Sequence, residues 1–281
     1  MEIWDAYYSD GTPANVDLIR GEATPDGLYH LVAEVIVRHI DGSFLATQRD
    51  FRKKNFGGYW EISAGGAVQK GETAYQAAVR ELYEETGIVC KNLEKTYRLC
   101  SKKYPCIYFG YISTVDCDKN QIRLQEGETV AYRWVAGEKI IRFMKDKGYV
   151  TIHADRTLPY IHSLVDKTGS NADCLIGCTA NVTVDRPIGS VHPKHSDMVY
   201  KLNYGYIKGI IAPDGEEQDA YIVGVDVPVT EFTGKIIAII HRKNDIESKW
   251  VVAPEGKHFS KTEIKRLTHF QEQYFDTEII M

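Results

Sequence analysis

The first half of the chain opens with β-type patterns. Apolar and β-branched residues dominate positions 30–37 and 43–48, with Asp41 and Gly42 as turn residues between them. This arrangement predicts a β-hairpin, because such turn residues join antiparallel strands. A helical periodicity, with apolar residues at steps of three and four, then follows at residues 73–86.

Helical periodicity returns at residues 138–145 and 159–167. We expect Pro159 in the first turn of the second of these helices, where a missing N–H removes no helical hydrogen bond. The polar stretch at 169–176 is then a linker. These patterns predict a first domain that spans residues 1–168.

From residue 177 onward the pattern changes to short strands and one terminal helix. Strands are predicted at residues 181–184, 221–225, 235–240 and 249–252. The helix spans residues 261–275, where Ser260 and Glu263 form a capping box. Four apolar residues share one face of this helix: Ile264, Leu267, Phe270 and Tyr274. Residues 177–281 therefore form a second, β-rich domain, and the whole chain is of the α+β class.

The composition narrows the classes of function. The 281 residues are 43% hydrophobic and 26% charged, which excludes a disordered or coiled-coil chain and fits two domains. The formal net charge of -5 gives no overall basic field, which argues against a nucleic-acid partner. The N-terminus lacks a signal-peptide pattern, and no apolar run reaches the ~18 residues of a membrane span. We therefore expect a cytoplasmic protein without a membrane partner.

The six cysteines include no Cys-x-x-Cys pair, and we interpret them as reduced thiols. Cys174 and Cys178 are close enough in sequence to serve a metal. A zinc site would need a second Cys/His pair, and none at the required spacing lies nearby.

The predicted helix at residues 73–86 carries a group of carboxylates. Thr73 with Gln76 forms a capping box at its start, and Gly87 is a natural terminator. The residues expected to be buried along one face are Tyr75, Ala78, Val79 and Leu82. Three glutamates project together on a neighbouring flank: Glu81, Glu84 and Glu85. Like charges at this spacing repel, so the helix is either a solvated acidic surface or binds a cation such as Mg²⁺ or Mn²⁺, which prefer carboxylate oxygens.

The string around this helix resembles the Nudix box, Gly-x5-Glu-x7-Arg-Glu-Uaa-x-Glu-Glu-x-Gly-Uaa, where Uaa is a bulky aliphatic residue. Every fixed position is present, at Gly66, Glu72, Arg80, Glu81, Leu82, Glu84, Glu85, Gly87 and Ile88. The resemblance covers about residues 1–168 and implies the Nudix α/β/α sandwich with a mixed sheet. It also implies an Mg²⁺-dependent hydrolase that cleaves a nucleoside or other organic diphosphate.

The same resemblance implies a role for each residue of the box. The implied Mg²⁺ ligands are Glu81, Glu84 and Glu85. Arg80 would orient these glutamates, Glu72 would support the site, and Gly66 would allow a close turn. The general base varies within the family, and Glu84 and the loop residue Glu128 are both candidates. A basic loop before the box either attracts an anionic substrate or is simply solvated; it contains Arg49, Arg52, Lys53 and Lys54.

The N-terminal segment resembles the Nudix branch that includes isopentenyl-diphosphate isomerase. The matching residues are Trp4-Asp5, Gly11, Arg20-Gly21-Glu22 and Gly27-Leu28-Tyr29-His30. That isomerase uses a catalytic cysteine shortly before the box, and residues 58–66 contain none. Hydrolysis is therefore the better hypothesis, with isomerisation of a prenyl diphosphate as the alternative.

Acidic residues also gather in the second domain. Asp214, Glu216 and Asp219 lie in one short loop that opens into a strand, which suits either a divalent cation or an ordinary Asp/Gly turn. The segment Asn203-Tyr204-Gly205-Tyr206, followed by this loop, resembles soluble inorganic pyrophosphatases of the OB-barrel family. The resemblance implies a small OB-like β-barrel with a C-terminal helix that hydrolyses inorganic pyrophosphate.

The pyrophosphatase resemblance also implies site residues. The implied metal ligands are Asp214, Glu216, Asp219 and Asp245, with Glu247 as a further candidate. The implied phosphate contacts are Arg186, Tyr204, Lys249 and Tyr274. This sequence departs from that family at Glu216, Glu217 and Phe275, where Asp, Pro and Lys are usual. The second domain is therefore either a pyrophosphatase or a non-catalytic phosphate-binding module.

Together these patterns predict an Mg²⁺-dependent hydrolase with two sites. The first domain would cleave a small-molecule diphosphate, and the second would hydrolyse the pyrophosphate released from a nucleoside triphosphate. The sequence leaves open the identity of the organic substrate and the metal preference. It also leaves open the oligomeric state, for which a homo-oligomer is one of the options.

Overall fold

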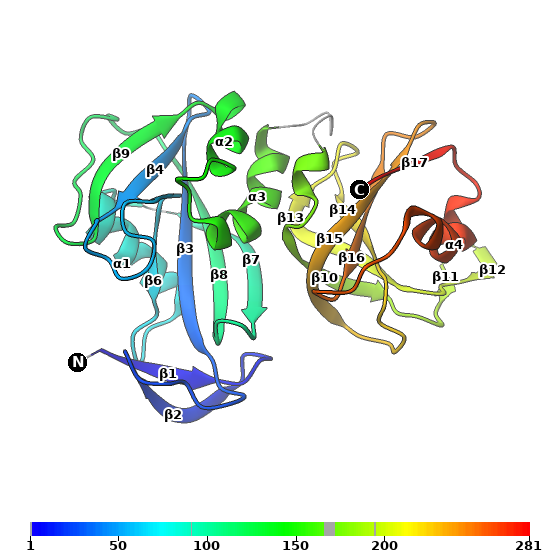
Figure 1. Cartoon of the computed structure of the whole chain (residues 1–281), viewed down its shortest axis with the longest axis horizontal. Helices are drawn as coiled ribbons and strands as arrows, with labels where there is room; N and C mark the ends of the chain where they lie inside the picture. Colours follow the sequence, from blue (N-terminus) through cyan, green and yellow to red (C-terminus); the bar gives the residue numbers. More distant parts are fainter. Residues whose placement is uncertain (1, 91, 166–171, 194) are drawn as a thin grey trace. The chain divides into compact units, whose positions relative to one another are not determined.

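The computed structural model describes residues 2–90, 92–165, 172–193 and 195–281. The chain divides into two compact units, Met1–Ala154 and Asp155–Met281 (Figure 1). The division falls inside helix α3 (Thr151–Val165), earlier than the predicted boundary after residue 168. Residues 169–171 of the predicted linker lie outside the described residues, and the chain then continues in a short 3-10 helix, η1 (Ala172–Leu175).

The first unit is built on a seven-stranded mixed sheet, as predicted. Its long strands β3 (His30–His39) and β8 (Cys106–Val115) run parallel. The other strands are β4 (Phe44–Arg49), β5 (Trp60–Glu61), β6 (Ala64–Ala67), β7 (Glu94–Ser101) and β9 (Thr129–Val135). The two strands of the predicted hairpin are confirmed, but β3 and β4 pair at Arg38 and Phe44, next to the turn, and then diverge. They diverge because β6 pairs with the preceding residues of β3.

An N-terminal hairpin, β1 (Ile3–Tyr7) and β2 (Pro13–Ile19), supports the loop that leads into helix α1 (Ala74–Thr86). The backbone N–H of Lys70 donates to the carbonyl of Ile3 (2.9 Å), and that of Gly71 donates to the carboxylate of Asp5 (2.7 Å). The Lys70 ammonium also pairs with Asp17 on β2 (2.6 Å). These contacts fix the loop before the helix begins.

Helix α1 begins and ends where its caps predict. The capping box of Thr73 and Gln76 is present, and Gly87 caps the other end with φ 72°, a conformation that suits glycine. The helix packs on β3 and β6, with its buried residues Ala77, Ala78 and Leu82 in the core of the unit. The expectation that Tyr75 is buried was wrong, because the small side chains of the alanine face let the helix lie close to the sheet and leave Tyr75 on its outer side, 43% exposed.

Two more helices follow the sheet, α2 (Gly137–Met144) and α3. Pro159 lies inside α3 rather than in a first turn, so that expectation was wrong. The reason is that α3 begins at Thr151, eight residues earlier than the apolar pattern suggested. Because proline has no N–H, the helix continues past residue 159 without the hydrogen bond that this position would otherwise make to the carbonyl four residues earlier.

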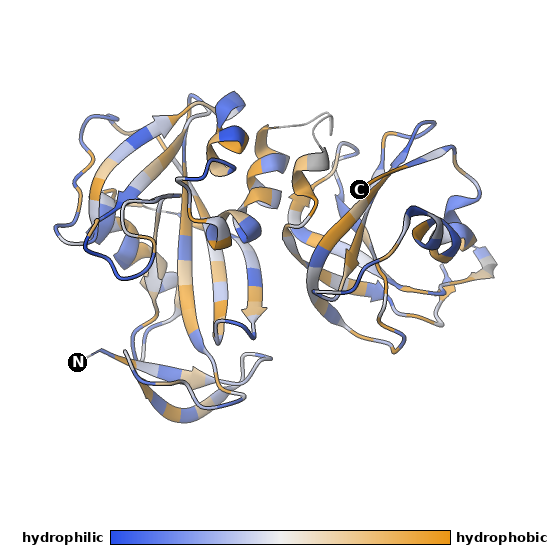
Figure 2. Cartoon of the chain, in the orientation of Figure 1, coloured by the Kyte–Doolittle hydropathy of each residue, from blue (hydrophilic) through white to orange (hydrophobic). Residues whose placement is uncertain are grey.

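The second unit is β-rich, as predicted. Its main sheet contains β10 (Thr179–Arg186), β13 (Asn203–Ile211), β14 (Glu217–Ile222), β15 (Glu231–Arg242), β16 (Ser248–Ala253) and β17 (Thr277–Ile280). The strand order is β10-β13-β14-β16-β15-β17, and β10 also pairs with β15, which closes a ring of hydrogen-bonded strands. A separate hairpin is formed by β11 (Val191–His192) and β12 (His195–Val199). Figure 2 shows the middle of β15 as a hydrophobic stretch, in keeping with its buried isoleucines.

The last helix, α4 (Lys261–Glu272), has the predicted capping box of Ser260 and Glu263. Ile264 is fully buried, and Leu267 and Phe270 pack against the same core. Tyr274 is 64% exposed, contrary to expectation, because the helix ends before it and the helical periodicity no longer applies. No helix among the described residues is both long enough and apolar enough to cross a bilayer.

Candidate functional site

Arg80 lies at the centre of the first group of predicted site residues. Its guanidinium binds Glu72 through two hydrogen bonds, from Nε to Oε1 (3.0 Å) and from NH2 to Oε2 (2.9 Å). The NH1 group donates to Glu81 (2.7 Å) and to Glu84 (3.1 Å). The hydrogen bonds to Glu72 raise the pKa of Arg80, so it remains a cation. The loop before α1 and the flank of α1 are therefore joined by one arginine.

The Glu81 carboxylate lies so close to the backbone at position 66 that only a glycine can occupy that position. A Cβ atom at position 66 would lie 2.3 Å from Oε1 of Glu81, far inside van der Waals contact. Gly66 does not adopt a positive φ, whereas Gly71 and Gly87 do, at 77° and 72°. Gly66 is thus needed for the close approach of a carboxylate and not for the close turn that the sequence suggested.

Glu85 is the most deeply buried carboxylate of the group, at 8% exposure. It accepts a hydrogen bond from the backbone N–H of Gly65 (3.2 Å). Burial raises the pKa of Glu85 well above its usual value, and repulsion from Glu61 and Glu81 raises it further. Burial likewise raises the pKa of Glu81. The site therefore holds more negative charge than its own cations neutralise.

Sequence reasoning missed Glu61. This residue lies on β5, shortly before the glycine-rich turn, and its carboxylate pairs with Arg49 (2.7 Å). A glutamate on a strand directly before the box was the available signal. Among the described residues, no three Asp, Glu, His or Cys side chains are grouped as a preformed metal site, because Arg80 engages Glu81 and Glu84 while Glu85 is turned toward Gly65.

The basic loop forms one side of this site. Lys53 pairs with Glu128, the loop residue considered as a general base. Burial lowers the pKa of Lys53, and the neighbouring charges of Arg49 and Arg20 lower it further. Arg52 instead binds Asp50 (2.7 Å) and holds the pKa of that carboxyl at about 2. Both Arg52 and Lys54 are exposed to solvent. Arg20 pairs with Glu2 (2.5 Å) and lies near enough to Lys53 to lower its pKa, and it was not singled out as a candidate from the sequence.

The second unit contains a charged cluster of its own. Lys249, whose side chain is 4% exposed, pairs with Asp219 and with Glu247. Arg242, which the sequence analysis missed, forms two hydrogen bonds to Glu272 (2.7 and 3.0 Å) and approaches Asp245 and Glu247 (3.4 and 3.3 Å). An arginine directly after the apolar middle of β15 and His241 was the local signal for this role.

The remaining predicted residues of the second unit divide into two groups. The guanidinium of Arg186 lies 5.4 Å from the ring centre of Tyr204, and the pKa of Tyr204 is raised well above its usual value by burial and by Asp219. Asp219 therefore connects Arg186 and Tyr204 with Lys249. Asp214 and Glu216 lie instead in the exposed turn between β13 and β14, where the Glu216 N–H donates to Asp214 (3.0 Å).

Comparison with known proteins gives the family of the first unit. A model of the NUDIX domain matches residues 28–154. An uncharacterized Nudix hydrolase of Listeria innocua is 33% identical over 141 residues, which cover 50% of this chain and 83% of that protein. Another, from Pseudomonas aeruginosa, is 37% identical over 147 residues, which cover 51% of this chain and 78% of that protein.

Among solved structures, a protein of Deinococcus radiodurans aligns with 53% of this chain and 92% of its own, with 17% identity and a TM-score of 0.46. The family match ends at Ala154, the last residue of the first unit, and does not extend into the second. With the box, the mixed sheet and the sequence identity in agreement, the chain belongs to the Nudix hydrolase family, whose domain forms its first half.

Proposed function

We propose that the first unit hydrolyses the phosphoanhydride bond of a nucleoside or other organic diphosphate, with Mg²⁺ held by Glu81, Glu84 and Glu85. The observation that carries this proposal is the buried carboxylate of Glu85, whose pKa is raised by burial and by the like charges of Glu61 and Glu81 more than the attraction of Arg49 lowers it. A buried charge next to like charges is costly unless a counter-ion accompanies it. Carboxylate oxygens are the ligands that Mg²⁺ prefers, and Mn²⁺ accepts the same set.

Each residue of the site has a distinct task under this proposal. Mg²⁺, when bound, polarises a phosphoryl oxygen and lowers the pKa of a water molecule. Arg80 holds Glu81 and Glu84 in place through its hydrogen bonds, and Glu72 in turn fixes Arg80. Glu84 is 41% exposed and is therefore able to accept a proton from an attacking water.

The basic residues would bind the phosphates. The charges of Arg20 and Arg49 lower the pKa of Lys53, and Arg49 pairs with the Glu61 carboxylate. These cations would neutralise the phosphate oxygens of a diphosphate bound at this site. Glu128, paired with Lys53, is the second candidate for the general base. Because a bound phosphate competes for Lys53, it would release Glu128 from this pair.

The test is a hydrolysis assay over nucleotide sugars, dinucleoside polyphosphates and nucleoside triphosphates with Mg²⁺. On the best substrate, Glu84→Gln should lower kcat by at least about a hundredfold, the range expected for loss of a metal ligand or a general base. The matched control is Glu94→Gln, an exposed glutamate on β7 in the same unit. Equal rates in the two variants would remove Glu84 from the mechanism.

We further propose that the second unit hydrolyses inorganic pyrophosphate. The support is the cluster in which Asp219 lies between Lys249 and the Arg186–Tyr204 pair, together with the closed ring of strands expected of an OB-like barrel. Asp219, Asp245 and Glu247 would share divalent cations, and Arg186 and Lys249 would contact phosphate. Four carboxylates, with Glu272 included, face two buried cations, so this cluster also lacks positive charge.

Phosphate release from pyrophosphate with Mg²⁺ tests this second activity. We expect release by the unmodified protein and by Glu84→Gln, and a loss of at least about a hundredfold in Asp219→Asn, because that change removes a charge from the proposed metal cluster. If the folded, unmodified protein releases no phosphate with Mg²⁺ or Mn²⁺, the second unit is a non-catalytic binding module.

A further inference from the structure

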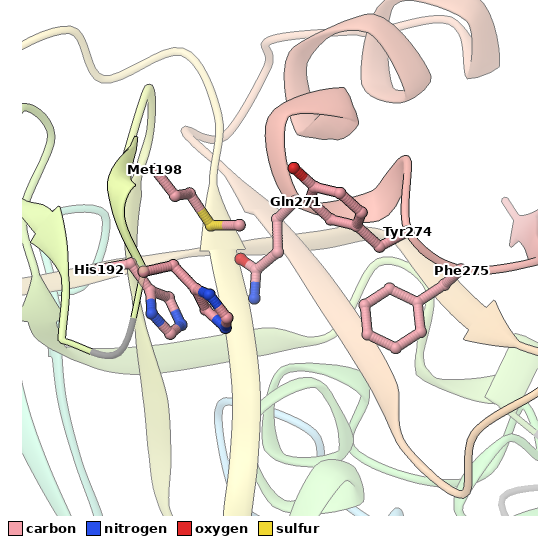
Figure 3. A pocket seen from close by; sticks show the side chains of 6 residues that line it. His192, Met198, Gln271, Tyr274 and Phe275 are labelled. Carbon is pink, nitrogen blue, oxygen red and sulfur yellow. The ribbon is translucent and has the colours of Figure 1, made fainter.

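The second unit contains a cavity of about 430 Å³, and among its described lining residues only Tyr274 was named above as a phosphate contact. Its walls come from two elements: the β11–β12 hairpin supplies His192, His195 and Met198, and the end of α4 with the following turn supplies Gln271, Tyr274 and Phe275. Figure 3 shows these side chains gathered around one open space, with His192 opposite the rings of Tyr274 and Phe275. The volume is within the range of small-molecule sites, roughly 300–1,000 Å³.

The chemistry of the lining favours a planar aromatic ligand. Among the described residues that line the cavity there is no lysine, arginine or carboxylate, so the cavity is not built for phosphate alone. Two imidazoles, two aromatic rings and a thioether offer flat or polarisable surfaces on which a ring can stack. The imidazoles are already arranged as a pair, with ring centres 4.8 Å apart.

Gln271 adds a directional contact. The Tyr221 hydroxyl lies 2.9 Å from the Gln271 amide and 2.6 Å from the carboxylate of Glu272, which takes the proton of that hydroxyl. The Gln271 amide keeps hydrogen-bonding capacity for a ligand, and Figure 3 places this side chain between His192 and Tyr274. A ring with polar atoms on its edge is the kind of group that such an amide recognises.

The cavity shares its walls with the charged cluster of the same unit. The Phe275 ring, which lines the cavity, lies 3.6 Å from the guanidinium of Arg242. His192 stacks on Tyr200, whose ring lies 5.8 Å from the guanidinium of Arg186. A ligand whose ring occupies the cavity would therefore have its other end next to the residues proposed to handle phosphate.

We propose that this cavity binds the heteroaromatic ring of a nucleoside phosphate, with the phosphate directed toward the cluster around Arg242 and Lys249. The phosphate half of this inference rests on the proposed function of the second unit, while the ring half rests on the cavity alone. Phe275, which stands where pyrophosphatases usually have Lys, then replaces a phosphate contact with a stacking surface.

The experiment is calorimetric titration of the full chain with AMP, GMP, CMP and UMP in the presence of Mg²⁺. None of these contains a phosphoanhydride bond, so neither proposed activity consumes them. We expect at least one to bind at least about tenfold more tightly than ribose 5-phosphate. Tyr274→Ala should weaken that binding about tenfold, because it removes a stacking surface. The matched control is Tyr104→Ala, a tyrosine of the first unit that is 40% exposed.

The outcomes separate this inference from the proposed pyrophosphatase. The proposal that the cavity binds a ring fails if no nucleotide binds more tightly than ribose 5-phosphate. It also fails if Tyr274→Ala and Tyr104→Ala bind the nucleotide with equal affinity. Either result counts against the ring site whether or not the protein hydrolyses pyrophosphate. If Tyr274→Ala alone loses affinity while the unmodified protein releases no phosphate from pyrophosphate, the ring site stands and the pyrophosphatase proposal fails. Because Tyr274 is 64% exposed and lies beyond the end of α4, its removal leaves the core intact.

Discussion

Glu85→Gln is expected to stabilise the metal-free protein while removing its hydrolysis of organic diphosphates. In the absence of metal the Glu85 carboxylate is buried near Glu61 and Glu81, and the glutamine has the same shape without the charge. Its amide oxygen can still accept the hydrogen bond of Gly65. Relief of an uncompensated buried charge is worth about 1–3 kcal/mol. Loss of a proposed metal ligand should lower kcat/KM by about a thousandfold.

The measurement is thermal unfolding at pH 8 with EDTA, followed by the hydrolysis assay on the best substrate. A gain of about 1 kcal/mol corresponds to a rise in Tm of about 2–4 °C in a protein of this size. Glu94→Gln again serves as control, since an exposed glutamate should change neither quantity. An unchanged or lower Tm in Glu85→Gln would mean that the buried carboxylate is already compensated without metal, against the proposed role.

Gly66→Ala is expected to reduce activity strongly while the fold persists. The added methyl group would overlap Oε1 of Glu81. The overlap is relieved at the lowest cost in free energy when the flexible Glu81 side chain rotates away from its position. Glu81 would then leave the hydrogen bond that Arg80 donates to it. We expect kcat/KM to fall about a hundredfold and the Mg²⁺ concentration for half-maximal activity to rise at least fivefold, because a displaced ligand weakens metal binding.

Gly148→Ala is the matched control for this change. Gly148 also lies in the first unit without a positive φ, and a Cβ there would lie 3.4 Å from the Asp146 carboxylate, an ordinary contact. Circular dichroism should show the same fold for both variants. If Gly66→Ala and Gly148→Ala hydrolyse substrate equally well, the space at Gly66 does not govern the position of Glu81.

The box helix was predictable because its signals are local. Thr73 with Gln76 starts the helix and Gly87 ends it, and a residue spacing of three and four places Glu81, Glu84 and Glu85 on adjoining positions. Arg80 is the chain neighbour of Glu81 and lies four residues before Glu84, so its ion pairs with both glutamates follow from helical geometry. Short runs of β-branched residues likewise located β10, β14, β15 and β16, whereas β13, β17 and the β11–β12 hairpin were not predicted.

The sequence by itself therefore determined the family, the capped helices and the candidate ligands, since each depends on residues within a few positions of one another. Only the tertiary structure decided that Glu61 and Arg20 join the first site, that Arg242 organises the cluster of the second unit, and that Tyr274 faces an open cavity. These placements depend on strand pairing and on where a helix stops. Contacts between residues far apart in the chain arise only when the sheets form, and no local spacing encodes them.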